Sequence, residues 1–186
     1  TCRKQKCKTA KQHTSKCYIL ETMHRDDYLQ LPLDELLRAC TLKGYQGSGP
    51  GGQHRNKTNT GVCLRLAPYN LEIKSCESRS VSENKTHALH RMQLALAIYV
   101  REPPKPESQL KFPGSNGRIQ TSNPQYPQFI ANVLDIVEAN GGDTKVAAKA
   151  FGLSPTALTK ILHADKHVLK AMQDIRVKKG KPPLKR

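Results

Sequence analysis

Aromatic and acidic residues are scarce in this chain. Its 186 residues include three Phe, six Tyr and no Trp, and 15 Asp and Glu stand against 31 Lys and Arg, for a formal net charge of +16. A cationic surplus of this size indicates a polyanionic partner, and nucleic acid is the leading candidate. Because few aromatic rings are available to stack on bases, we expect contacts with phosphates to dominate.

Long apolar runs are also lacking. No segment of the sequence is apolar enough to suggest a membrane span, and no basic amphipathic helix is evident. The sequence therefore does not favour a membrane surface as the polyanion. With 37% hydrophobic residues, the chain can build one modest core and a small satellite domain.

The six cysteines contain no C-x-x-C pair, which is the common spacing of a metal site. Cys63 and Cys76 fall in segments of alternating apolar residues, where we expect buried, reduced thiols. The spacing of Cys2, Cys7 and Cys17 in a basic segment leaves zinc binding open as an alternative. We expect no metal site and no cofactor, and the cysteine pattern does not require an oxidising compartment.

The glycine-rich run of residues 47–58, GSGPGGQHRNKT, is the most informative stretch of the chain. Glycine lets main-chain amides approach a ligand closely, and Pro50 restricts the chain just before the glycine pair. We therefore expect a shaped loop that carries Gln53 into a narrow site. The polar and cationic flank of that glutamine would bind RNA, and it comprises His54, Arg55, Asn56 and Lys57.

This run resembles the signature of the class I peptide-chain release factor catalytic domain. A bare Gly-Gly-Gln would be a weak signal, whereas Gly-x-Gly-Pro-Gly-Gly-Gln-His-x-Asn-Lys is highly specific. The resemblance continues through residues 56–62 and the following strand, and it reaches Arg79, Ser80 and a helix with Asn84. It covers roughly residues 33–101.

The resemblance implies hydrolysis of the peptidyl-tRNA ester, with Gly51, Gly52 and Gln53 as the catalytic residues. This reaction needs an attacking water and a place for negative charge on the carbonyl oxygen, and one preorganised donor there is worth about 3–4 kcal/mol. Gln53 is neutral, so it can orient water without acting as a strong base. In family terms, its backbone amide contacts the oxyanion region, the glycines fit against the tRNA terminus, and the ribosome supplies most of the remaining site.

Neither flank of this segment resembles the codon-reading domains that release factors carry, and the chain is short. We therefore expect a codon-independent hydrolase of the kind that acts on stalled ribosomes. The expected partners are the ribosome, through its large-subunit RNA and peptidyl-tRNA, and ribosomal proteins that would meet the C-terminal helical part of the chain.

The chain divides into five predicted parts. Residues 1–17 form a basic N-terminal arm, 18–101 a release-factor-like GGQ domain, 102–123 a linker rich in Pro and Gly, 124–180 a helical module and 181–186 a basic tail. The arm has no acidic residue and cannot bury a core. We expect it to bind RNA, and the alternatives are a solvated tail or the remnant of a targeting segment. Its RNA-binding residues are Arg3, Lys4, Lys6, Lys8 and Lys11.

The predicted fold class is α+β, a small mixed α/β release-factor catalytic domain followed by an all-helical module of helix-turn-helix type. In the catalytic domain, Pro32 and Asp34 open a short helix, and residues 39–46 form a strand. Residues 62–66 alternate as a half-buried strand, and 71–75 form its hairpin partner. Pro68-Tyr69-Asn70 lies in the turn between them.

A longer helix follows this hairpin. Ser80 and Glu83 match a capping box at its start. The helical period then places one apolar stripe against the sheet, and this stripe comprises Ala88, Met92, Ala95 and Tyr99, with Leu89 and Leu96 beside it.

Four helices are predicted in the helical module. Pro127 opens the first and Gly141-Gly142 ends it, Asp143 marks the second, Ser154-Pro155 begins the third, and the fourth covers about residues 166–178. A turn at Gly152 gives the second and third helices a helix-turn-helix pattern. The third helix offers few side chains that read base edges, so we favour docking to ribosomal RNA or protein over readout of a DNA sequence.

Three functions remain open from the sequence. The first is ribosome-dependent hydrolysis of peptidyl-tRNA. The second is a non-catalytic structural or assembly role in a large ribosomal subunit, including a mitochondrial one, and the third is a nucleic-acid-binding regulator that uses the helix-turn-helix. The basic amino end and the absence of an initial Met favour the mitochondrial matrix over a bacterial cytoplasm.

Overall fold

The computed structural model describes residues 23–45 and 60–184. The chain divides into two compact units, Thr1–Met92 and Gln93–Arg186. Helices and a three-stranded sheet make up the described part of the first unit, and the second is helical, so the α+β prediction is confirmed. The predicted arm of residues 1–17 and the glycine-rich run of residues 47–58 lie outside the described residues.

The sheet of the first unit is antiparallel, in the order β1-β2-β3. Its strands are β1 (Thr41–Tyr45), β2 (Gly61–Leu66) and β3 (Leu71–Ser75). The predicted alternation of β2 is confirmed, since Val62, Leu64 and Leu66 are buried and Arg65 is exposed. The hairpin turn lies where the sequence predicts it, in the 3₁₀ helix η1 (Ala67–Tyr69) and the left-handed Asn70, which has φ 51°.

Two short helices precede the sheet. The predicted helix at Pro32 is confirmed as α3 (Leu33–Ala39), with Leu36 fully buried. Helix α2 (Arg25–Gln30) was not predicted, and its buried face includes an arginine and an aspartate. Arg25 is 1% exposed and forms an ion pair of 2.7 Å with Asp26. A charged pair in the buried face hides the apolar period on which the prediction of a helix depends.

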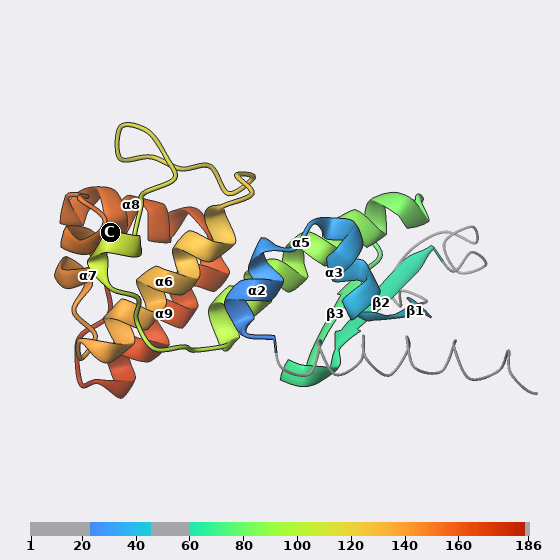
Figure 1. Cartoon of the computed structure of the whole chain (residues 1–186), viewed down its shortest axis with the longest axis horizontal. Coiled ribbons are helices and arrows are strands. Elements are labelled where there is room, and N and C mark those ends of the chain that lie inside the picture. Colours follow the sequence, from blue (N-terminus) through green and yellow to red (C-terminus); the bar gives the residue numbers. More distant parts are fainter. Residues whose placement is uncertain (1–22, 46–59, 185–186) are drawn as a thin grey trace, which may run out of the picture. The chain divides into compact units, whose positions relative to one another are not determined.

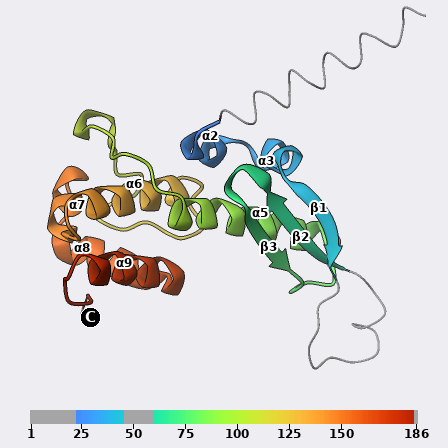
Figure 2. The ribbon, with the colours of Figure 1, turned by 90° about the horizontal axis from the view of Figure 1, so that it is seen from below.

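The long helix α5 (Val81–Tyr99) begins in the first unit and ends in the second. In the first unit it lies along the sheet in both views (Figure 1, Figure 2) and buries Ala88, Leu89 and Met92. The prediction for Tyr99 was wrong, because this residue is 68% exposed. Tyr99 is the last residue of α5. The helical period predicts which face of a helix is apolar, but it does not predict how far along the helix that face is covered by other elements.

The predicted capping box at the start of α5 is only half formed. The Glu83 amide donates to Ser80 Oγ at 3.4 Å, as predicted. The Ser80 amide, however, donates to Ser78 Oγ at 3.0 Å, and this hydroxyl in turn donates to the Glu83 carboxylate. Ser78 therefore occupies the place that a capping box gives to Glu83, because the chain turns back before the helix and brings a nearer acceptor.

The second unit contains the four predicted helices. They are α6 (Tyr126–Ala139), α7 (Thr144–Ala150), α8 (Pro155–Ala164) and α9 (Lys166–Lys178). The predicted cap of α8 is present, since Ser154 accepts from the Ala157 amide at 3.2 Å, and α7 begins at the expected place, where Asp143 accepts from the Lys145 amide at 2.9 Å. Gly142 closes α6 by donating to the Val137 carbonyl at 2.8 Å.

Part of the predicted linker belongs to the core of the second unit. Leu110 is buried there, and Phe112 and Ile119 pack against the same cluster. The Phe129 ring lies edge-on to Phe112 and Phe151, with centroids 5.4 and 4.9 Å away. The first unit ends at Met92 rather than at the expected residue 101. The apolar side chains of residues 102–123 have no regular period, and the segment is rich in Pro and Gly. For these reasons the sequence predicted a linker there.

Candidate functional site

The two strands that flank the glycine-rich run hold its ends at one point of the sheet. Tyr45, the last residue of β1, pairs with Gly61, the first residue of β2. The described residues on either side of positions 46–59 are therefore neighbours across two antiparallel strands. The predicted catalytic residues Gly51, Gly52 and Gln53 lie in this segment, outside the described residues, and so do His54, Arg55, Asn56 and Lys57.

Gly61 fits this position because it has no side chain. A Cβ atom at residue 61 would lie 2.3 Å from the Tyr45 carbonyl oxygen and 3.1 Å from the Cys76 Cβ. Since the first of these contacts is with backbone, a side-chain rotation cannot relieve it. Gly44, on the facing strand, has no such neighbour within 4 Å. The requirement for glycine is therefore specific to the point where the chain re-enters the sheet.

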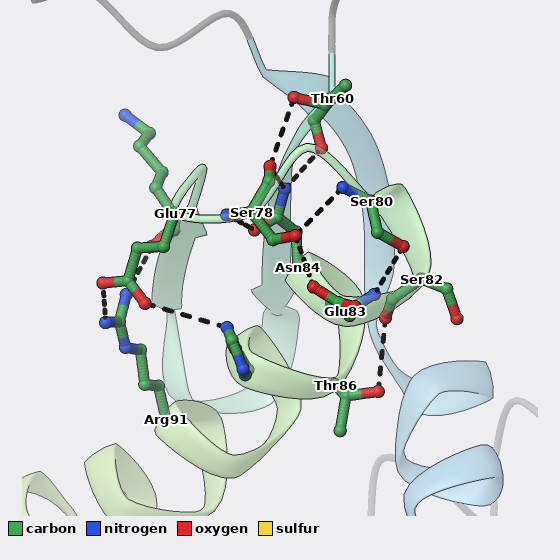
Figure 3. A network of polar contacts seen from close by, with 11 residues as sticks. Thr60, Glu77, Ser78, Ser80, Ser82, Glu83, Asn84, Thr86 and Arg91 are labelled. Carbon is green, nitrogen blue, oxygen red and sulfur yellow. Dashed lines mark hydrogen bonds and ion pairs between the residues drawn. The ribbon is translucent and has the colours of Figure 1, made fainter.

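A buried asparagine ties this re-entry point to the start of α5 (Figure 3). Asn84 is fully buried, and its Nδ2 donates to the carbonyl oxygens of Thr60 and Ser78, at 2.9 and 2.7 Å. Its Oδ1 accepts from the Ser78 amide at 2.9 Å. One side chain thus satisfies three backbone groups, two of them on Ser78 in the turn before α5 and one on Thr60, directly before β2. Such a satisfied buried network favours one backbone arrangement over others.

Charged side chains support the same turn. Glu77 forms an ion pair with Arg91 of α5, and its carboxylate lies 3.7 Å from His87 Nδ1 (Figure 3). Arg91 also donates to the Lys74 carbonyl at 3.4 Å, which joins β3 to α5. These groups are about half exposed, so their individual contributions to stability are small.

A lysine of β3 lies over the ring of Tyr45, the last residue of β1. Lys74 Nζ lies 5.4 Å from the centroid of the Tyr45 ring and 3.1 Å from a carboxylate oxygen of Glu72. The hydrogen bond and charge of Lys74 lower the pKa of Glu72, and the same pair raises the pKa of Lys74. Both groups stay charged at neutral pH, and the lysine can interact with the tyrosine face.

Positive charge is unevenly distributed along the chain. Residues 23–45 and 60–92 contain eight Lys or Arg and seven Asp or Glu, so this framework is nearly neutral. Residues 1–22 and 46–59 contain eight Lys or Arg, including Arg3, Lys4, Lys6, Lys8 and Lys11 of the arm, against one Glu, so they hold most of the net positive charge of the first unit. In the second unit, residues 143–186 contain eleven Lys or Arg against three Asp.

Metal ligands do not cluster among residues 23–45 and 60–184, where no group of three His, Cys, Asp or Glu is close enough to hold an ion. In this part of the chain Cys40, Cys63 and Cys76 are free thiols, and burial raises the pKa of Cys40 to about 11. Cys2, Cys7 and Cys17 lie outside it. No helix of the described residues is long and apolar enough to cross a membrane.

Sequence reasoning gave no role to Gly61 or Asn84, although both fall in the segment of resemblance. A signal for Asn84 was present, because an asparagine in the first turn of a helix is more often found hydrogen-bonding nearby backbone than facing solvent. For Gly61 the sequence offers no comparable signal, since the clash depends on the strand register.

The RF-1 domain family matches residues 37–126, a range that includes the glycine-rich run and its frame. Peptide chain release factor 2 of Helicobacter pylori strain G27 is 32% identical over 102 residues, 55% of this chain and 27% of that protein. These two similarities support membership of residues 37–126 in the class I release factor catalytic domain family.

Further relatives show the same limited overlap with this release-factor domain. Peptide chain release factor 2 of Neorickettsia sennetsu is 32% identical over 87 residues, 47% of this chain and 23% of that protein. For Campylobacter hominis the identity is 32% over 79 residues, 42% and 21% of the two chains. This chain therefore spans about a quarter of the length of these relatives. No solved structure matches it.

Proposed function

We propose that this chain is a ribosome-associated, release-factor-like protein that hydrolyses the peptidyl-tRNA ester on stalled ribosomes without codon recognition. The observation that carries the proposal is the frame around residues 46–59 inside a release-factor domain. Tyr45 and Gly61 hold the two ends together, and Asn84 fixes the second end. Such a frame suits a loop that must reach a distant site while its backbone conformation stays fixed.

The chemistry is assigned to the loop and to its partner. Gln53 orients the attacking water, and its backbone amide donates to the developing oxyanion, which preorganised donors stabilise strongly. The flank from His54 to Lys57 holds RNA phosphates. The nearly neutral framework contributes position rather than affinity, so the arm of residues 1–17 and the cations after residue 143 supply the electrostatic attraction to ribosomal RNA.

Codon-independent action is part of the proposal because, within this sequence, neither flank of the release-factor segment resembles a codon-reading domain. The proposed location is the mitochondrial matrix. A regulator that reads DNA through α8 is less well supported, because the turn of residues 115–120 forms the opposite wall of a hollow over this helix. A recognition helix needs that surface free to enter the major groove.

The experiment uses purified ribosomes that hold peptidyl-tRNA on an mRNA without a codon in the decoding site. We expect the wild-type protein to release the peptide and Gln53→Ala to bind these ribosomes with the same affinity but release far less. The matched control is Gln109→Ala, at an exposed glutamine of the second unit. If the wild-type protein releases nothing and instead remains bound to purified large subunits through high-salt washing, the structural role is correct and the hydrolase proposal fails.

A further inference from the structure

An open cavity of about 740 Å³ lies in the second unit, between α8 and the turn before α6. The turn is held by reciprocal backbone hydrogen bonds between Ser115 and Arg118, at 3.1 and 2.9 Å, with Asn116 and Gly117 in the left-handed region. Gly117 faces α8 closely, since a Cβ there would lie 3.3 Å from the Ala157 Cβ. A hydrogen-bonded turn and a helix therefore shape this cavity.

The charge of the cavity has a single sign. Arg118 of the turn and Lys160 of α8 are its charged residues, and none of the residues that line it is acidic. Within residues 23–45 and 60–184, neither cation forms an ion pair with a carboxylate. Two unpaired cations on facing walls favour an anionic ligand.

The remaining residues that line the cavity suit a ligand that has polar and apolar groups in addition to an anionic one. Ser115, Asn116, Gln120 and Thr156 supply hydroxyl and amide groups, whereas Ile119, Ala157, Ile161 and Ala164 supply an apolar surface. The Ser154 hydroxyl is already engaged as the cap of α8. Ligand sites of this size combine an apolar lining with a few polar groups that fix orientation. A nucleotide has the matching parts, namely a phosphate, a ribose with hydroxyls and a flat base.

The surroundings favour a nucleotide within a strand. The cavity is open, so a chain can enter and leave it, and residues 143–186 carry eleven Lys or Arg against three Asp. Phosphates on either side of a bound nucleotide would meet these cations and release counterions. Single-stranded RNA exposes its bases for insertion into pockets, while a duplex does not.

We propose that the cavity between residues 115–120 and α8 binds one nucleotide of a single-stranded RNA, with Arg118 and Lys160 on the phosphate and the apolar lining under the base. This inference goes beyond peptidyl-tRNA hydrolysis and does not depend on residues 51–53. The site would let the helical unit grip an unpaired segment of RNA.

The test measures binding of a fluorescently labelled single-stranded RNA to the full chain without ribosomes. We expect Arg118→Gln and Lys160→Gln each to raise Kd about tenfold, the loss typical of one charge-assisted hydrogen bond. Ala164→Leu, which fills the cavity without changing charge, should also weaken binding. The matched controls are Lys145→Gln and Ala139→Leu, at exposed positions outside the cavity, which should leave Kd unchanged.

Three results would overturn the proposal. Equal losses from Lys160→Gln and Lys145→Gln, with none from Ala164→Leu, would mean diffuse electrostatic attraction rather than a site. Adenosine monophosphate that binds as tightly as the RNA would mean a site for a free nucleotide. Inorganic phosphate that competes as well as adenosine monophosphate would mean that the base is not recognised. None of these three results changes the expected release of peptide from ribosomes, so failure of the RNA-site proposal is distinct from failure of the proposed function.

Discussion

The two units of this chain stabilise themselves in different ways. In the first, a small sheet and α5 are joined by one buried asparagine that satisfies three backbone groups, and the described framework is nearly neutral. In the second, capped helices enclose an apolar core with three edge-on phenylalanines, and its C-terminal half is strongly cationic. Under the proposed function, the first unit positions residues 46–59 and the second unit contributes affinity for RNA.

The largest effect is expected from the aromatic core of the second unit. Phe129→Ala removes a ring that is 2% exposed and contacts both Phe112 and Phe151. We expect a loss of about 3–5 kcal/mol in the free energy of unfolding, from lost transfer energy and the cavity left behind. Hydrogen exchange of amides in α6 and α8 measures it. Val177→Ala is the control, since Val177 is 64% exposed, and equal losses from both variants would contradict this description of the core.

A somewhat smaller loss is expected at the asparagine of the first unit. Asn84→Ala leaves the Thr60 and Ser78 carbonyls and the Ser78 amide without their partner. Because unsatisfied buried groups cost about 1–3 kcal/mol each and partial relaxation lets water in, we expect a net loss of about 3 kcal/mol. Exchange should accelerate in β2 and β3.

The control for this substitution is Thr86→Ala, two residues further along α5. Its exposed hydroxyl donates to the Ser82 carbonyl at 3.2 Å and satisfies no buried group. If α8 amides lost as much protection as β2 amides in Asn84→Ala, the network would not be specific to the first unit, and the contrast between the units would fail.

Two glycines on facing strands sharpen the contrast within the sheet. Gly61→Ala places a Cβ against the Tyr45 carbonyl, so the strands must separate, and we expect a loss of about 1–3 kcal/mol. Gly44→Ala, with open space around it, should be neutral or slightly stabilising. Thermal unfolding compares the two. Equal melting temperatures would show that the frame of residues 46–59 tolerates movement.

The smallest effect concerns a thiol beside the sheet. Burial raises the pKa of Cys40 to about 11, because an apolar environment disfavours the thiolate. Alkylation at Cys40 should therefore be slow at neutral pH and increase as the pH rises toward that value. In urea the same cysteine should react with an ordinary pKa near 9.0. Peptide mass spectrometry follows each cysteine separately, and identical pH profiles in both conditions would contradict the burial.

The helices of the second unit were predicted well from the sequence because helix ends are determined by residues close to them in the chain. Asp143, Ser154-Pro155 and Gly141-Gly142 act within a few residues of their own positions, and each lies where it was expected. Two features depend on packing between segments distant in sequence and were missed. They are the exposure of Tyr99 and the packing of Phe112 and Ile119. Helix α2 was missed for another reason, because the adjacent residues Arg25 and Asp26 place a charged pair in its buried face.

The candidate site divides in the same way. Residues 51–57 were chosen from a local motif and lie outside the described residues, so their assignment remains a prediction. The frame around them was found only in the structure, because the clash at Gly61 and the three bonds of Asn84 arise from strand register and from the return of α5. Local motifs predict which residues carry the chemistry, whereas the fold shows which residues position that segment.

In the proposed function, residues 46–59 carry the chemistry and the basic segments carry the affinity for the ribosome. Single-turnover peptide release by Gly52→Ala on stalled ribosomes, with the ribosome Kd measured on the same samples, tests it most directly. A Cβ at this glycine would hinder close backbone approach to the tRNA terminus. We predict that release is abolished while the Kd is unchanged. Undiminished release by Gly52→Ala would contradict the catalytic assignment.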